Sequence, residues 1–189
     1  YEHAVELFEG DKRARISLER LVEIALHTGD FQRVEDYFAK LGTRTSEPAV
    51  PYVRAKYHFF RNELAAATTL FAAIGSSSPY FVQARYFSGV IAVKKSELEQ
   101  ALAAFAVVGR LPAKNDVDRE VQELAHMAMA RIHHERGDID RAVPLYRAID
   151  RQSKYYRDAM YELGWAYFKG THYEKAYFTF GNLLRIDPD

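Results

Sequence analysis

The stretch Glu174-Lys175-Ala176, followed by Phe180, recurs three more times in this chain as an alanine placed four residues before an aromatic side chain. The other copies are Leu64-Ala65-Ala66-Ala67 with Phe71, Glu99-Gln100-Ala101 with Phe105, and Asp140-Arg141-Ala142 with Tyr146. The alanines are 34, 41 and 34 residues apart, and a period of 34 residues is typical of repeated helical hairpins. The chain is therefore predicted to be all-α: a right-handed superhelical α-solenoid of about five hairpins after a partial N-terminal repeat.

The last hairpin carries the repeat pattern most completely. Its spaced positions are Met160, Leu163, Gly164, Tyr167, Ala176, Phe180, Leu183 and Pro188. This pattern resembles the tetratricopeptide repeat family, in which small residues let two helix backbones approach closely. The resemblance extends along the whole chain and weakens toward the N-terminus. It implies helices over about 155–169 and 173–185.

The repeats divide the 189 residues into a single array. We expect a partial repeat over 1–10 and hairpins over about 15–47, 48–81, 82–115, 123–156 and 157–189. The longer 41-residue interval adds seven residues around 114–120, which should lengthen a loop or the following helix. Ser96-Glu97-Leu98-Glu99 has the pattern of a capping box. Because the chain opens within a repeat and closes where another helix would start, we interpret it as a fragment of a longer protein.

The composition is that of a folded globular protein without a charge bias. Of its residues 48% are hydrophobic, and Lys plus Arg equals Asp plus Glu at 26 each. No net positive field would therefore draw the chain to nucleic acid. No apolar run is long enough to insert directly into a bilayer. Cysteine is absent, so neither a disulfide framework nor a thiol nucleophile is available.

The sequence carries no recognisable catalytic motif, because it lacks both a glycine-rich phosphate loop and a Gly-x-Ser-x-Gly nucleophile elbow. The densest histidine cluster is His126, His133 and His134 beside Glu135. His126 and His133 occupy slots that Met160 and Tyr167 fill one repeat later, so we expect both to pack between helices. The prediction is a protein that is not an enzyme and holds no metal or cofactor.

The family resemblance implies a concave face lined by the first helix of each hairpin. The partner-binding positions predicted on it are Tyr52, Lys56, Phe60, Tyr86, Lys94, Met127, Arg131, Tyr161, Trp165 and Lys169. Aromatic and arginine side chains are common interface anchors. Trp165 is the sharpest candidate, since the usual tryptophan of the family is earlier in the helix, in the slot of Met160. The alternative is that these rings pack against neighbouring repeats and the cations are solvated.

Two repeat junctions share a longer phrase, Ser78-Pro79-Tyr80 leading to Gly89 and Ser153-Lys154-Tyr155 leading to Gly164. The phrase resembles the repeats of tetratricopeptide proteins of the bacterial envelope. It implies a scaffold in an envelope complex, in the periplasm or at the outer membrane, that binds a protein or peptide partner. The alternatives are a cytoplasmic adaptor or regulator, and a non-catalytic module attached to an enzyme. Self-association through the array ends is a further expectation.

Overall fold

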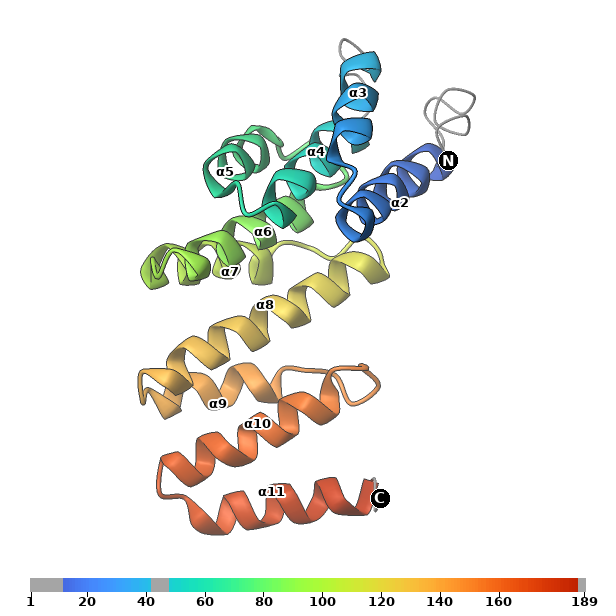
Figure 1. Ribbon diagram of the computed structural model, residues 1–189. Coiled ribbons are helices and arrows are strands. Elements are labelled where there is room, and N and C mark those ends of the chain that lie inside the picture. Colours follow the sequence, from blue (N-terminus) through green and yellow to red (C-terminus); the bar gives the residue numbers. More distant parts are fainter. Residues whose placement is uncertain (1–11, 42–47, 187–189) are drawn as a thin grey trace. The chain divides into compact units, whose positions relative to one another are not determined.

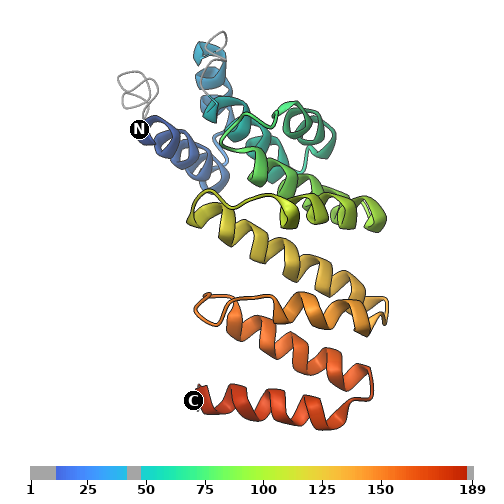
Figure 2. The ribbon, with the colours of Figure 1, turned by 180° about the vertical axis from the view of Figure 1, so that it is seen from behind.

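The computed structural model describes residues 12–41 and 48–186, and every regular element in these ranges is an α-helix (Figure 1, Figure 2). The all-α prediction is confirmed for this part of the chain. The helices are α2 (Lys12–Thr28), α3 (Phe31–Leu41), α4 (Ala49–Phe60), α5 (Leu64–Ala73), α6 (Phe81–Lys94), α7 (Leu98–Arg110), α8 (Asp116–Glu135), α9 (Ile139–Arg147), α10 (Tyr156–Lys169) and α11 (Tyr173–Ile186). The expected partial repeat over 1–10 lies outside the described residues.

The chain forms two compact units, 1–91 and 92–189, whose boundary falls within α6. In the first unit α4 packs against α2 and α5. Its core is rich in aromatic rings, and Phe71 is fully buried there. The Phe71 ring stacks on Phe87, with ring centroids 5.0 Å apart and an interplanar angle of 3°. Burial of these rings stabilises the first unit.

In the second unit α8, α9, α10 and α11 follow one another, each packed against the helix before it (Figure 1). Its core is centred on α9 and α10, where Tyr146, Ala159 and Ala166 are fully buried. The last hairpin confirms the helix bounds predicted from its repeat pattern to within one residue at each end.

The small residues of the repeat pattern lie where two helices touch. Ala67, Ala101 and Ala142 are 0% exposed and Ala176 is 3% exposed. At Gly164 a Cβ atom would lie only 2.5 Å from Cε1 of Phe180. Alanine and glycine are therefore required at these positions by the close approach of the paired helices.

Each hairpin turns at a residue in the left-handed backbone region. These residues are Gly29, Asn62, Ser96, Gly137 and Thr171, with φ between 60° and 79°. At the last of them, the N–H of Thr171 donates to the Phe168 carbonyl at 3.0 Å, and that of His172 to the Tyr167 carbonyl at 2.8 Å. This pair of bonds is a Schellman motif, which ends a helix and satisfies its last carbonyls.

The capping box predicted at Ser96 is wrong. Ser96 closes the helix before the turn, with φ 62°, and the N-cap of α7 is Glu97, which makes no capping bond through its side chain. The same residue types fit a capping box and a C-terminal cap, but here position 96 is the left-handed residue that ends the preceding helix. Ser96 is therefore part of a C-terminal cap.

The seven extra residues between the third and fourth anchors lengthen a helix. The helix α8 has 20 residues, against 14 in α10. Asn115 caps its start by accepting a hydrogen bond from the N–H of Asp118 at 2.8 Å. Asp118 is 2% exposed, and its Oδ2 accepts from the N–H of Lys114 at 3.1 Å. This reciprocal cap fixes the first turn of the longer helix.

Candidate functional site

Two predicted positions of α10, Tyr161 and Trp165, are exposed beside Phe168 and Tyr173, which were not among the predicted positions. Tyr161, Trp165 and Phe168 are 52%, 46% and 51% exposed, and Tyr173 at the start of α11 is 58% exposed. Neighbouring rings meet at steep angles: their centroids are 6.3 Å apart for Tyr161–Trp165, 5.7 Å for Trp165–Phe168 and 5.4 Å for Phe168–Tyr173. We call these four residues the aromatic row.

The aromatic row rests on Phe180 of α11. Its ring centroid lies 5.6 Å from that of Trp165 and 6.0 Å from that of Tyr161. Phe180 can take this place because Gly164, next to Trp165 in sequence, has no side chain to exclude its ring. The indole of Trp165 therefore packs on Phe180 while nearly half of the side chain stays exposed.

Charged groups border the aromatic row and are engaged within the chain. Arg131 of α8 and Glu162 of α10 form a two-pronged ion pair, with Nε 2.8 Å from Oε2 and Nη2 2.5 Å from Oε1. The Nζ of Lys169 donates to the carbonyls of His134 at 2.8 Å and Glu135 at 3.1 Å. These carbonyls belong to the last turn of α8, where a cation is favoured by the helix dipole. The two predicted cations therefore fasten α10 to α8.

Met127 and Tyr52 are buried, which corrects their predicted place on an exposed surface. Met127 is 2% exposed and belongs to the core of the second unit. Tyr52 is 6% exposed, and its ring stacks on Tyr80 with centroids 4.8 Å apart. Both residues lie in the first helix of a hairpin at positions predicted to face outward, but neighbouring parts of the chain cover them. They act as packing residues.

The other predicted positions have mixed surroundings. In the first unit, Nζ of Lys56 lies 5.7 Å from the Tyr52 ring centroid and 6.0 Å from that of Phe60, which is 48% exposed. Tyr86 is half-buried and meets Phe87 edge to face at 6.0 Å. In the second unit Lys94 is exposed at the end of α6. A role of these residues in partner binding stays a prediction.

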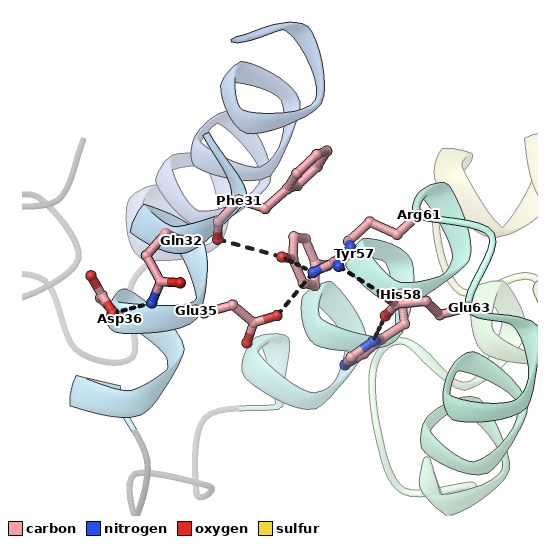
Figure 3. Close-up of polar contacts among 8 residues, drawn as sticks. All are labelled: Phe31, Gln32, Glu35, Asp36, Tyr57, His58, Arg61 and Glu63. Atoms are coloured by element: carbon pink, nitrogen blue, oxygen red, sulfur yellow. Dashed lines mark hydrogen bonds and ion pairs between the residues drawn. The ribbon is translucent and has the colours of Figure 1, made fainter. Parts of the chain in front are cut away.

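A polar cluster in the first unit was missed from the sequence (Figure 3). Nη1 of Arg61 donates to the Tyr57 hydroxyl at 2.7 Å and to Glu35 at 3.3 Å. Its Nη2 pairs with Glu63 at 2.9 Å, and the other oxygen of Glu63 lies 2.6 Å from Nδ1 of His58. Burial raises the pKa of Tyr57, so its hydroxyl stays neutral and can accept from Arg61. The cluster joins α3, α4 and the start of α5, and its charges satisfy one another.

The histidines of α8 pack against neighbouring groups instead of meeting at one point. Nε2 of His126 lies 3.0 Å from the position that a Cβ atom would take at Gly109 of α7. Nδ1 of His133 lies 3.4 Å from Oδ2 of Asp138. No group of three or more His, Asp or Glu residues suited to a metal ion occurs in residues 12–41 and 48–186.

The His126 ring gives a prediction for pH dependence. Burial lowers the pKa of His126, so the unfolded chain binds this proton more readily than the folded one. The contribution of His126 to the free energy of unfolding should therefore be fully present above the unfolded pKa of about 6.5. It should fall as the pH drops below that value, by at most about 1.4 kcal/mol per pH unit. His126→Met should reduce the loss measured by urea unfolding between pH 7 and pH 5.

The control for this variant is His172→Gln, because His172 is exposed. Part of the pH dependence should remain in His126→Met, since burial also lowers the pKa of His134. If His126→Met and His172→Gln change the pH profile equally, the burial of His126 is not the cause.

Comparison with known proteins agrees with the repeat architecture. Residues 125–189 match the model of the tetratricopeptide repeat family. The C-terminal part of a TPR repeat-containing protein from Cytophaga hutchinsonii superimposes with a TM-score of 0.67 at 18% identity, over 90% of this chain and 65% of that chain. YrrB, described as a TPR protein with an unusual peptide-binding site, gives a TM-score of 0.60 at 18% identity, over 99% of this chain and 92% of its own. No curated protein matches the sequence.

The described helices form the hairpins of a repeat protein, and the family match agrees with a protein-interaction scaffold. The predicted resemblance to the tetratricopeptide repeat family is confirmed by the family match over 125–189 and by the repeat folds of the similar structures. None of the helices in the described part of the chain is both long and apolar enough to cross a bilayer.

Proposed function

We propose that this protein is a non-catalytic scaffold that binds a peptide segment of a partner protein through the aromatic row. The observation that carries the proposal is the exposure of Trp165, at 46%, within an ordered line of rings. Leaving a tryptophan this exposed forgoes the stabilisation of burying it, which a bound partner would restore. Tryptophan is also enriched among the residues that dominate binding energy.

The surroundings of Trp165 favour one kind of peptide. The rings offer apolar surface, whereas Arg131 and Glu162 already neutralise each other. A peptide with a large apolar side chain therefore suits the centre of the row, and polar backbone groups suit its border. A strongly charged peptide would have to compete with the existing ion pair.

The similarity to YrrB supports the proposal of a peptide ligand, because that protein has a similar fold and is described as having a peptide-binding site. The binding surface proposed for this chain rests on its own residues.

The bacterial envelope is the proposed setting, and it rests on the two junction phrases. Each phrase forms the same local turn: Oγ of Ser78 accepts from the N–H of Tyr80 at 3.2 Å, and Oγ of Ser153 from that of Tyr155 at 3.1 Å. Fractionation of source cells with an antibody to the protein tests the setting. Recovery in the cytosol would favour the adaptor or regulator, and recovery with a catalytic domain on the same chain would favour the enzyme-associated module.

Self-association is proposed through α11, whose Tyr177 and Leu184 are 76% and 67% exposed. Static light scattering between low and high protein concentration tests it. A constant monomer mass over that range would exclude this contact.

Peptides selected by phage display on the immobilised protein test the proposed function. Trp165→Ala should weaken binding of a selected peptide about 30-fold by isothermal titration calorimetry, since a central aromatic anchor contributes about 2 kcal/mol. The control is Phe178→Ala, which removes an aromatic ring of α11 that lies outside the row and is 66% exposed. Equal effects of the two variants would contradict the proposed surface.

A further inference from the structure

A cavity of about 350 Å³ lies among the end of α9, the connection after it, α10 and α11. Its apolar lining residues include Met160, Leu163 and Leu183. Its polar lining residues include Arg147, Arg151 and Asn182. The volume is at the small end of the range for ligand pockets, so the cavity suits one or two residues of a peptide.

The cavity and the aromatic row use different faces of α10. Successive residues of an α-helix are rotated by about 100°, which places Leu163 about 160° around the helix from Trp165. Leu163 lines the cavity and is 3% exposed, whereas Trp165 is 46% exposed. A ligand in the cavity would therefore leave the aromatic row free.

The two arginines at the cavity indicate a negatively charged ligand. Arg147 and Arg151 are exposed, and neither guanidinium group forms a hydrogen bond or ion pair within the described part of the chain. No Asp or Glu lines the cavity. By contrast, Arg131 of the same unit has Glu162 as its carboxylate partner, and Arg136 has Glu99 at 2.7 Å.

We propose that this cavity binds a peptide carboxylate that stands next to an apolar side chain. Arg147 and Arg151 would hold the carboxylate, since guanidinium groups match its two oxygens in shape and charge. The adjacent apolar side chain would cover Met160 and Leu183. A C-terminal carboxylate and an Asp or Glu side chain share this chemistry.

The probes are short peptides that isolate each element of the proposal. Acetyl-Ala-Ala-Leu with a free carboxylate is compared with its C-terminal amide, and acetyl-Leu-Glu-Leu-amide with its Gln counterpart. Binding is followed by NMR through the arginine Nε–H signals and the methyl signal of Met160, which is easily assigned because the chain has only three methionines. At least one acid peptide should bind tenfold or more tightly than its neutral partner, and the better acid identifies the source.

The variants separate the cavity from general charge effects. The double variant Arg147→Gln, Arg151→Gln should lower the affinity for the acid peptide to that measured for its neutral partner. The control is Arg110→Gln, which removes a similarly exposed arginine from the last turn of α7. Asn182→Trp, at an exposed position beside the cavity, should block the peptide while circular dichroism stays unchanged.

Three outcomes would overturn the proposal. The acid and neutral peptides could bind with equal affinity, inorganic phosphate could bind as tightly as the acid peptide, or the double arginine variant could bind the acid peptide as tightly as the unchanged protein does. Trp165→Ala should leave cavity binding unaltered. Loss of binding at the aromatic row and loss of binding at the cavity are therefore distinguishable, and either can fail alone.

Discussion

Replacing Phe71 by alanine is expected to lower the free energy of unfolding by about 3–5 kcal/mol. Phe71 is 0% exposed, stacks on Phe87 and meets Tyr52 edge to face at 6.2 Å. Removing the ring loses its apolar burial and leaves a cavity bordered by the rings of Phe87 and Tyr52. Urea unfolding followed by circular dichroism measures the change.

The control for Phe71→Ala is Phe60→Ala, which removes the same ring from a position that is 48% exposed. Its expected cost is below about 1 kcal/mol. If both variants lost the same stability, the aromatic core assigned to residues 1–91 would be wrong.

Replacing Tyr146 by alanine should cost the second unit a similar amount, about 3–5 kcal/mol. Tyr146 is 0% exposed and belongs to the core that joins α8, α9 and α10. The ring is expected to make most of the contribution, since the buried hydroxyl is near Glu162 but makes no hydrogen bond of ordinary geometry among the described residues. Urea unfolding again provides the measurement.

The paired variant Tyr146→Phe separates the ring from the hydroxyl. It should change stability by less than about 1 kcal/mol, since removal of a buried hydroxyl without a partner leaves no unpaired group behind. Burial raises the pKa of Tyr146, so the hydroxyl carries no charge at pH 7 that the substitution would remove. A loss as large as that of Tyr146→Ala would mean that the hydroxyl is bonded in solution.

The fold was predictable because each repeat needs side chains of small volume where its two helices touch. A helix pair that approaches closely leaves room only for alanine or glycine, and the sequence shows these residues at fixed intervals, as at Ala142 and Ala176. The turns were harder to predict. The left-handed position that ends the first helix of each hairpin holds Gly137 in one repeat but Ser96 and Thr171 in others. Residue type alone therefore does not mark this turn.

The surface was only partly predictable from register. Register gives the direction of a side chain from its helix, and at Trp165 this was enough to predict an exposed ring. It does not say what covers that direction, which is why Met127 and Tyr52 were placed on the surface although both are buried. The cavity was missed because Arg147, Met160 and Leu183 come from three helices, and no spacing in the sequence connects them.

The polar cluster of the first unit was missed for a related reason. Glu35 and Arg61 are 26 residues apart and meet only because α3 packs against α4. Charged residues of this kind are normally solvated, so their sequence pattern predicts an exposed face. Only the packing of the helices shows that they are partners.

Peptide binding at the aromatic row can be followed through Trp165, the single tryptophan of the chain. Its fluorescence is recorded while a display-selected peptide without tryptophan is added, and calorimetry measures the same binding independently. We expect the emission to shift to shorter wavelength, with a titration curve that gives the calorimetric Kd, because the bound peptide displaces water from the half-exposed indole. Calorimetric binding with unchanged tryptophan emission would contradict it.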